Sequence, residues 1–331
     1  MEVFSIIIPV YNRPEEIDDL LNSLTRQTYV HFEVIVVDDG SSIPCEPIVN
    51  AYNNRLRIRY FYIENSGPGL ARNQGVRYAE GEIVIVLDSD CIVPASYLEQ
   101  VHESLMRYKV DAFGGADRAH SSFSAIQKAV NYSMTSFFTT GGIRGSRRHL
   151  DAFYPRSFNM GMRKEVYEAL GGFSDMRYGE DIDFSIRIFK GGYKCRLFPG
   201  AWVYHKRRTD LKKFFKQVHN SGIARINLYK KYPESLKLVH LLPAAFTLGV
   251  ALLLVGGLFC PYSLLPILFY ALLVCVDSAC CNHSLRIGVY SIAASFIQLI
   301  GYGTGFWRAW WQRCILKEVS SKLFKRTFIN E

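Results

Sequence analysis

Two carboxylates separated by one residue follow an apolar run that has the composition of a buried strand. Asp88-Ser89-Asp90 comes directly after residues 82–87 (EIVIVL). Side chains two positions apart on an extended chain project to the same side, so the two carboxylates repel each other unless a cation or a ligand lies between them. Hard oxygen ligands suit Mg²⁺ or Mn²⁺, which usually share their coordination with substrate phosphates. The pair therefore predicts a site for a divalent cation and a phosphorylated ligand.

Other polar groups follow the ends of the neighbouring predicted strands. Asn12 comes after the first strand, and Asp38-Asp39 comes after the second. These paired acids could cap the following turn. Alternatively, one could accept a hydrogen bond from a nucleobase while the other orders an arginine. Residues 67–73 (GPGLARN) combine a glycine turn with the start of a helix, a geometry that can bind phosphate, and Arg72 adds a cation facing the acids.

The elements that must position these side chains alternate between strands and helices. Such alternation predicts an α/β fold with a mostly parallel sheet and helices on both faces. Ligands bind such sheets beyond the carboxyl ends of the strands, where these polar residues gather. The expected strands are 3–10, 32–37, 57–63 and 82–87, the expected helices are 14–24, 70–79, 96–108, 163–170 and 181–190, and 194–204 is expected to be extended.

Charge and hydropathy divide the 331-residue chain. Residues 1–205 carry 22 Lys/Arg and 25 Asp/Glu, whereas residues 206–237 carry 10 and 2, and residues 308–331 carry 6 and 2. The mean hydropathy of +0.04 is high for a soluble enzyme. Basic segments that flank an apolar region indicate a membrane with anionic lipids and argue against nucleic-acid binding. The eight cysteines have no spacing typical of zinc or redox sites.

The apolar region 238–306 predicts two or three membrane helices. Residues 238–259 contain no Asp, Glu, Lys or Arg and are long enough to cross a bilayer. A second span is expected at 262–281 despite Asp277. We favour two spans, with 287–311 in the interface or re-entrant, because a third would place the basic tail on the opposite side from 206–237. The segment before the spans, 209–231, is amphipathic and suits a membrane surface.

Five motifs resemble those of family-2 glycosyltransferases of the GT-A fold. They occur in that family's order and approximate spacing and cover about residues 3–205. The motifs are Ile8-Pro9-Val10-Tyr11-Asn12, Val37-Asp38-Asp39-Gly40-Ser41, Ala71-Arg72-Asn73, Leu87-Asp88-Ser89-Asp90 and Gly179-Glu180-Asp181.

The resemblance implies a role for each matching position. Asp181 would be the catalytic general base, and a divalent metal, Mn²⁺ or Mg²⁺, would be held by Asp90 and His205. The donor would be a nucleotide-diphosphate sugar, bound by Pro9, Tyr11, Asn12, Asp39, Arg72, Asp88 and Ser89. A single base and direct displacement predict inversion at the anomeric carbon.

The acceptor is expected to be a hydroxyl of a lipid-linked glycan or a surface polysaccharide. No Gln-x-x-Arg-Trp motif follows Asp181, so the chain differs from processive synthases and is expected to add one sugar and stop. A polyprenyl-phosphate glycosyltransferase is the nearer alternative. A nucleotidyltransferase would need a Gly-rich basic loop after the first strand, and residues 11–14 (YNRP) match such a loop poorly. A non-catalytic membrane scaffold would leave the five motifs unexplained.

These inferences give an expected organisation of four segments. Residues 1–207 would form the GT-A catalytic domain, 208–237 a basic juxtamembrane segment, 238–306 the membrane helices and 307–331 a basic tail. The catalytic domain would lie on the cytoplasmic side of the inner (plasma) membrane. Gly141–Arg148 is expected to be a mobile basic loop, and Phe153, Tyr154 and Asn159 are expected to shape the acceptor side.

Overall fold

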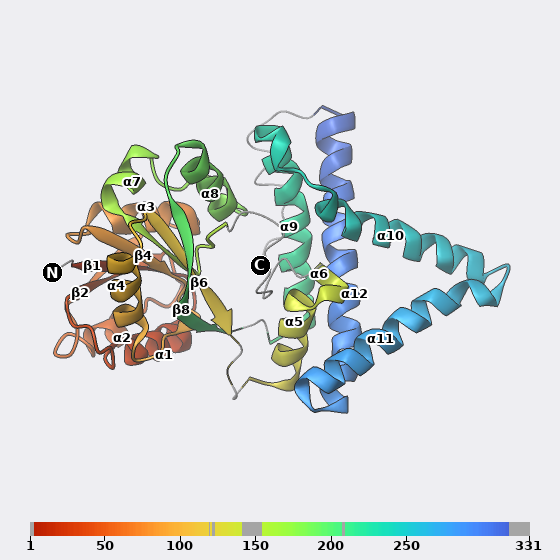
Figure 1. The fold of residues 1–331 in the computed structure, drawn as a ribbon, viewed down its shortest axis with the longest axis horizontal. Coiled ribbons are helices and arrows are strands. Elements are labelled where there is room, and N and C mark those ends of the chain that lie inside the picture. The colour runs from red at the N-terminus through yellow and green to blue at the C-terminus, as the bar shows by residue number, and fades with distance from the viewer. Residues whose placement is uncertain (1–2, 119, 121–122, 141–153, 207–208, 318–331) are drawn as a thin grey trace. The chain divides into compact units, whose positions relative to one another are not determined.

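The computed structural model describes residues 3–118, 120, 123–140, 154–206 and 209–317 (Figure 1). The chain divides into two compact units. The first comprises Met1–His120 and Asp151–Lys206, and the second comprises Ser121–Leu150 and Arg207–Glu331. Each unit is described separately below.

The first unit is built on an eight-stranded mixed sheet with the order β3-β2-β1-β4-β7-β6-β8-β5. Strands β1, β2, β3 and β4 are mutually parallel, whereas β7 is antiparallel to both of its neighbours. The strands are β1 (Phe4–Val10), β2 (Phe32–Asp39), β3 (Ile58–Ile63), β4 (Ile83–Leu87), β5 (Cys91–Ile92), β6 (Ala112–Arg118), β7 (Asn159–Arg163) and β8 (Cys195–His205).

Helices cover both faces of this sheet (Figure 1). Helices α1 (Pro14–Leu24), α2 (Glu46–Asn50) and α4 (Tyr97–Arg107) pack on one face, and α3 (Pro68–Arg77), α7 (Lys164–Ala169) and α8 (Glu180–Lys190) pack on the other. Strand β1 shows why two layers form. Its side chains alternate, so that Ile6 and Ile8 join the first core while Ile7 joins the second. A strand buried on both faces reads as a continuous apolar run.

The predicted fold class is confirmed, and the parallel strands and their helices lie close to the expected positions. The sequence did not reveal β5, β6 or β7. Strand β7 is short and directly precedes α7, and it contains polar Asn159 and a glycine, so its composition carries no strand signal.

The second unit is helical and consists of several helices around α12. Helix α12 (Leu285–Trp310) packs against α5 (Ala125–Thr135), α9 (Leu211–Lys231), α10 (Leu238–Gly257) and α11 (Leu265–Asn282). Smaller elements are α6 (Phe137–Thr140), the 3₁₀ turns Pro233–Ser235 and Pro261–Leu264, and a π-helical turn at Trp311–Ile315. The α9–α12 contact depends on glycine, because a Cβ at Gly222 would collide with the carbonyl of Tyr302. The membership of α5 in this unit was not predicted.

Three helices of this unit are long and apolar enough to cross a membrane. The segments are Leu238–Gly257, Pro261–Asn282 and Leu285–Ile315. Helix α12 is continuous over 26 residues, with no break at which a re-entrant segment would turn, and the expected placement of 287–311 in the membrane interface stays a prediction. Packing against four other helices buries the small residues and glycines that weakened its apolar signal in the sequence. The basic loop expected at Gly141–Arg148 lies outside the described residues.

Candidate functional site

The paired acids at the end of β2, Asp38 and Asp39, hold the loops that follow β2 and β3. Asp39 accepts hydrogen bonds from the backbone N–H of Ser66 (2.7 Å) and of Gly67 (2.9 Å). Gly67 has a φ of +93° and precedes α3, so this carboxylate fixes the loop that begins that helix. Burial raises the pKa of Asp39, and the hydrogen bonds from Ser66 and Gly67 oppose that effect.

Asp38 was expected to order an arginine if Asp39 bound a base, and the structure shows a different role. Its carboxylate accepts from the backbone N–H of Ser41 (2.9 Å) and Cys45 (3.1 Å) and from the hydroxyl of Tyr60 (2.9 Å). Burial alone would raise the pKa of Asp38, but these hydrogen bonds, those of Ser41 first, lower it below its ordinary value. Asp38 therefore holds the turn after β2, as the capping interpretation predicted.

The loop after β1 lies against the same turn. Asn12 adopts a φ of +51°, donates its backbone N–H to Ser41 Oγ (2.9 Å) and accepts from the backbone N–H of Ser42 (2.8 Å). Pro9 is buried within β1, whereas Tyr11 is half exposed. The structure thus brings the 9–12 loop and Asp39 to one edge of the sheet. The exposed Tyr11 ring is available to a planar ligand at this edge.

Arg72 connects the acid that ends β4 with the start of α8. Its guanidinium donates to Asp88 Oδ1 (2.7 Å) and to Glu180 Oε1 (2.9 Å), and its side chain is only 3% exposed. Arg72 comes from α3, which Asn73 fastens to the loop before α8 through two 2.8 Å hydrogen bonds with the backbone of Phe173. Burial raises the pKa of Glu180, and the Arg72 charge opposes that effect. The role of Glu180 was missed because nothing in the sequence shows that it faces Arg72.

Asp90 has an arginine and a histidine as partners of its own. One carboxylate oxygen contacts Arg13, and the other lies 3.1 Å from Nε2 of His205. The pairing of β5 with β8 places His205 opposite Cys91, and the His205 ring stacks on Phe158. The repulsion expected between Asp88 and Asp90 is therefore offset by two different arginines. Arg13 was not identified from the sequence.

This corner fits a divalent metal through Asp90 and His205. Asp90, Cys91 and His205 bring ligand atoms within 4.8 Å of one another. A carboxylate oxygen suits Mn²⁺ or Mg²⁺, and an imidazole nitrogen suits a transition-metal ion such as Mn²⁺ better than it suits Mg²⁺. Burial keeps the pKa of the Cys91 thiol well above its ordinary value, so Cys91 stays protonated and is a poor ligand for such a cation. A bound cation would act as a Lewis acid toward a leaving diphosphate.

Asp181 lies in the first turn of α8, where helix backbone N–H groups favour a negative charge. Its carboxylate lies 3.6 Å from Arg156 and is partly exposed. Gly179, with a φ of +83°, allows the sharp entry into this helix. Because Glu180 is fixed by Arg72, the neighbouring Asp181 is carried on a helix that is tied to the end of β4. Ser89, which lies between the two acids that follow β4, is buried and offers little surface to a ligand.

One residue expected on the acceptor side is structural. Asn159 is fully buried, accepts from the hydroxyl of Tyr97 (2.7 Å) and donates to the carbonyl of Ala201 (2.9 Å). Its amide therefore joins β7 to α4 and β8 and does not line a binding surface. Phe153 lies outside the described residues, and Tyr154 packs edge-on against Phe189.

Comparison with known proteins agrees with this geometry. The family described as Glycosyl transferase family 2 matches residues 5–171, about half of the chain. The chain is 35% identical over 134 residues to poly(ribitol-phosphate) beta-N-acetylglucosaminyltransferase TarS of Staphylococcus aureus, a match that covers 37% of this chain but only 23% of that protein. It is 29% identical to glycosyltransferase AglE of Haloferax volcanii over 70% of this chain and 78% of that one.

A solved structure gives the same picture of the fold. The mannosyltransferase PcManGT of Pyrobaculum calidifontis, in complex with GDP-Man and Mn²⁺, superposes with a TM-score of 0.63 at 20% identity, over 90% of this chain and 87% of that chain. The sheet, the polar residues at its carboxyl edge and the family match lead to one assignment. The chain belongs to glycosyl transferase family 2.

Proposed function

We propose that this chain is a metal-dependent, inverting glycosyltransferase that moves a sugar from a nucleotide-diphosphate sugar to a hydroxyl acceptor. The observation that carries the proposal is the double ion pair of Arg72 with Asp88 and Glu180. It fastens the helix that bears Asp181 to the strand end that bears the acid pair, which supports a proposed base and a proposed cation site at one edge of the sheet.

The donor would occupy the edge formed by the loops after β1, β2 and β4. Tyr11 and the 9–12 loop would contact the nucleobase, and Asp39, which already accepts from Ser66 and Gly67, would accept one further N–H from it. Asp88 would hydrogen-bond the donor's hydroxyls from a position that Arg72 fixes. Asp90 and His205 would hold Mn²⁺ or Mg²⁺. In support, one neighbour of similar fold is described with GDP-Man and Mn²⁺.

Asp181 would take the proton from the acceptor hydroxyl. Its position at a helix N-terminus stabilises the carboxylate, and an ordinary carboxylate is a weak base, so proximity and late proton transfer would provide most of its effect. One base opposite the leaving group leads to inversion at the anomeric carbon.

The acceptor would be a lipid-linked glycan or a surface polysaccharide at the cytoplasmic face of the plasma membrane. The three apolar helices and the basic segment 206–237 support a membrane location with anionic lipids. The relative from Staphylococcus aureus is named for a poly(ribitol-phosphate) acceptor, which is a polymer. A polyprenyl-phosphate acceptor is the second candidate, favoured by the same apolar helices.

The test is turnover of a panel of nucleotide sugars by the full chain in its membranes, with Mn²⁺ or with EDTA. The wild-type chain should turn over one donor of the panel, and it should do so with Mn²⁺ but not with EDTA. Asp181→Asn should lose turnover by at least a hundredfold while keeping nucleotide affinity, since Asp181 contacts no donor group in this proposal. The matched control is Asp175→Asn, an exposed acid in the loop before the same helix, which should behave as wild type.

Each outcome has a defined meaning. Failure of every donor to bind or react would contradict the proposal. Binding without turnover would indicate that the acceptor is missing, and adding a polyprenyl phosphate would then separate the two acceptor classes. Determining the anomeric configuration of the product by NMR would test inversion.

A further inference from the structure

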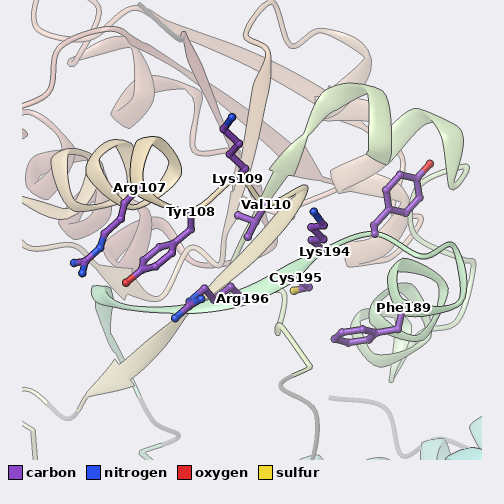
Figure 2. Close-up of a pocket in the computed structure, with 9 residues that line it drawn as sticks. Arg107, Tyr108, Lys109, Val110, Phe189, Lys194, Cys195 and Arg196 are labelled. Carbon is purple, nitrogen blue, oxygen red and sulfur yellow. The ribbon is translucent and has the colours of Figure 1, made fainter.

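An open groove of about 600 Å³ lies in the first unit (Figure 2). One wall comes from the end of α4 and the residues that follow it, and the other comes from the segment that leads from α8 into β8. Four cationic side chains and three aromatic side chains line it. The lining comprises Arg107, Tyr108, Lys109, Val110, Phe189, Tyr193, Lys194, Cys195 and Arg196.

The positive charge of this groove is not neutralised within the part of the chain that the structure describes. None of the four cations forms an ion pair there with an Asp or a Glu, although residues 1–205 contain more acidic than basic residues. The nearby carboxylate of Asp111 accepts from the backbone N–H of Lys194 (2.7 Å) and not from a side chain. The charge of these four side chains therefore favours an anion in the groove over a cation.

Two arginines of the groove are held by one aromatic ring. The guanidinium of Arg196 lies 3.9 Å from the centre of the Tyr108 ring, and that of Arg107 lies 5.3 Å from it. Figure 2 shows these three side chains together at one end of the groove. Stacking on a ring uses the face of a guanidinium and leaves its N–H groups available, which are suited to bind a phosphate with two parallel hydrogen bonds.

The sheet topology separates this groove from the candidate active site. Ala112 of β6 pairs with Cys195 of β8 and with Met162 of β7, which in turn pairs with Val84 near the start of β4. The acid pair follows the other end of β4. A five-residue strand spans about 16 Å, so one ligand group cannot occupy both places. Burial raises the pKa of the Cys195 thiol to about 12, which argues against thiol chemistry in the groove.

We propose that this groove is a second binding site that takes the phosphate groups of an anionic ligand, held by Arg107 and Arg196 at one end, with Lys109 and Lys194 lining the remainder of the groove. The same chemistry is offered by a soluble phosphorylated compound and by the headgroup of an anionic lipid. The proposal does not depend on the identity of the donor or acceptor at the active site.

Lysine acylation followed by mass spectrometry tests this site directly on the full chain in neutral detergent with EDTA. Inorganic pyrophosphate is the soluble probe. For the lipid probe, the chain is instead reconstituted without detergent in nanodiscs of phosphatidylcholine with phosphatidylglycerol, compared with nanodiscs of phosphatidylcholine alone. We expect saturable protection of Lys109 and Lys194, with labelling of the exposed Lys212 and Lys213 on α9 unchanged by pyrophosphate.

A variant without Arg107 and Arg196 still contains Lys109 and Lys194, the two lysines whose labelling reports binding. Arg107→Gln with Arg196→Gln should raise the probe concentration for half protection at least tenfold. The matched control, Arg26→Gln with Arg77→Gln, removes the same charge from exposed positions elsewhere in this unit and should leave protection unchanged. Circular dichroism verifies that both double variants fold, and the arginine-to-lysine version of the first pair should restore part of the protection.

Three results are informative. Protection by pyrophosphate identifies a soluble phosphorylated ligand, and protection only by the anionic nanodisc identifies a lipid headgroup. Either result supports the site when the Arg107/Arg196 variant weakens the protection at least tenfold. Absence of protection by either probe would overturn the proposal. The proposal would also be overturned if that variant needed the same probe concentration for half protection as wild type, or if all exposed lysines were protected equally, because such protection reflects general screening of charge.

Discussion

Replacing Arg72 with methionine should destabilise the first unit strongly. The Arg72 side chain is 3% exposed, and methionine keeps much of its volume while removing both ion pairs. Glu180, whose side chain is 8% exposed, would then be a buried carboxylate without its cation. Removing one partner of a buried ion pair costs about 3–5 kcal/mol, because the charge that remains is uncompensated.

The double-mutant cycle with Glu180→Gln separates this interaction from simple loss of packing. Arg72→Met with Glu180→Gln leaves no uncompensated charge at position 180. The double variant should therefore be more stable than the sum of the two single effects predicts, by about 1.5 kcal/mol or more. If the two effects add, Arg72 and Glu180 do not interact in the way the structure shows.

Thermal unfolding of the full chain in neutral detergent gives the measurement. For a unit of this size, 1 kcal/mol corresponds to a melting-temperature shift of about 2–4 °C, so Arg72→Met should lower the melting temperature by at least about 6 °C. Burial raises the pKa of Glu180, so protonated Glu180 contributes to the stability of the folded state at low pH. This stabilisation is lost as the pH rises through the raised pKa. The deficit of the variant should thus be larger at pH 8 than at pH 5. A shift below about 2 °C at both pH values would refute the reasoning.

Three further predictions concern other parts of the chain. His205→Gln should raise the Mn²⁺ concentration needed for half-maximal turnover by roughly tenfold or more, while metal-free nucleotide affinity, measured by calorimetry, stays unchanged. Asp38→Asn should cost about 2–3 kcal/mol at pH 7, seen as a lower melting temperature, because the backbone N–H groups it serves lose a charged acceptor. Since the pKa of Asp38 is lowered from 3.8, its stabilisation is lost as pH falls through that lowered value, and the variant should show a smaller acid-induced loss than wild type. Tyr132→Phe should lower the melting temperature in detergent by an amount equal to about 1–3 kcal/mol, because it removes the 2.5 Å hydrogen bond to Asp277 on an apolar helix, and an unchanged value would show that the carboxylate finds another donor.

The parallel half of the sheet could be predicted from the sequence because its strands are buried on both faces. Continuous apolar runs with polar residues at their ends are local signals, and β1, β2 and β4 all carry them. Strands β6 and β7 are formed by contacts between distant residues. Gly161 of β7 packs against the ring of Phe113 of β6, a fit that depends on two small segments meeting in space. No local pattern records such a requirement.

In the candidate site too, some residues could be identified from local sequence and others only from the fold. The acids at the strand ends could be identified because their spacing repeats a known motif, but their partners could not. Arg13 and Glu180 are single charged residues in segments that look like ordinary helix starts, and only the fold shows that each faces an acid or a cation of the site. Helix α5 is similar, since its sequence is compatible with a surface helix and its packing against α12 comes from distant chain segments.

Asp88 and Asp90 are each paired with an arginine, and the two arginines differ in how readily a metal ion could replace them. Arg72 is buried and shared between Asp88 and Glu180, so releasing Asp88 would also disturb the start of α8. Arg13 is 24% exposed and, among the described residues, forms an ion pair with Asp90 alone, so releasing Asp90 from it would break no second pair. We therefore expect Asp90 to exchange its arginine for a metal while Asp88 keeps its own. The acid pair would then consist of one fixed carboxylate that positions the donor and one exchangeable carboxylate that holds the cation.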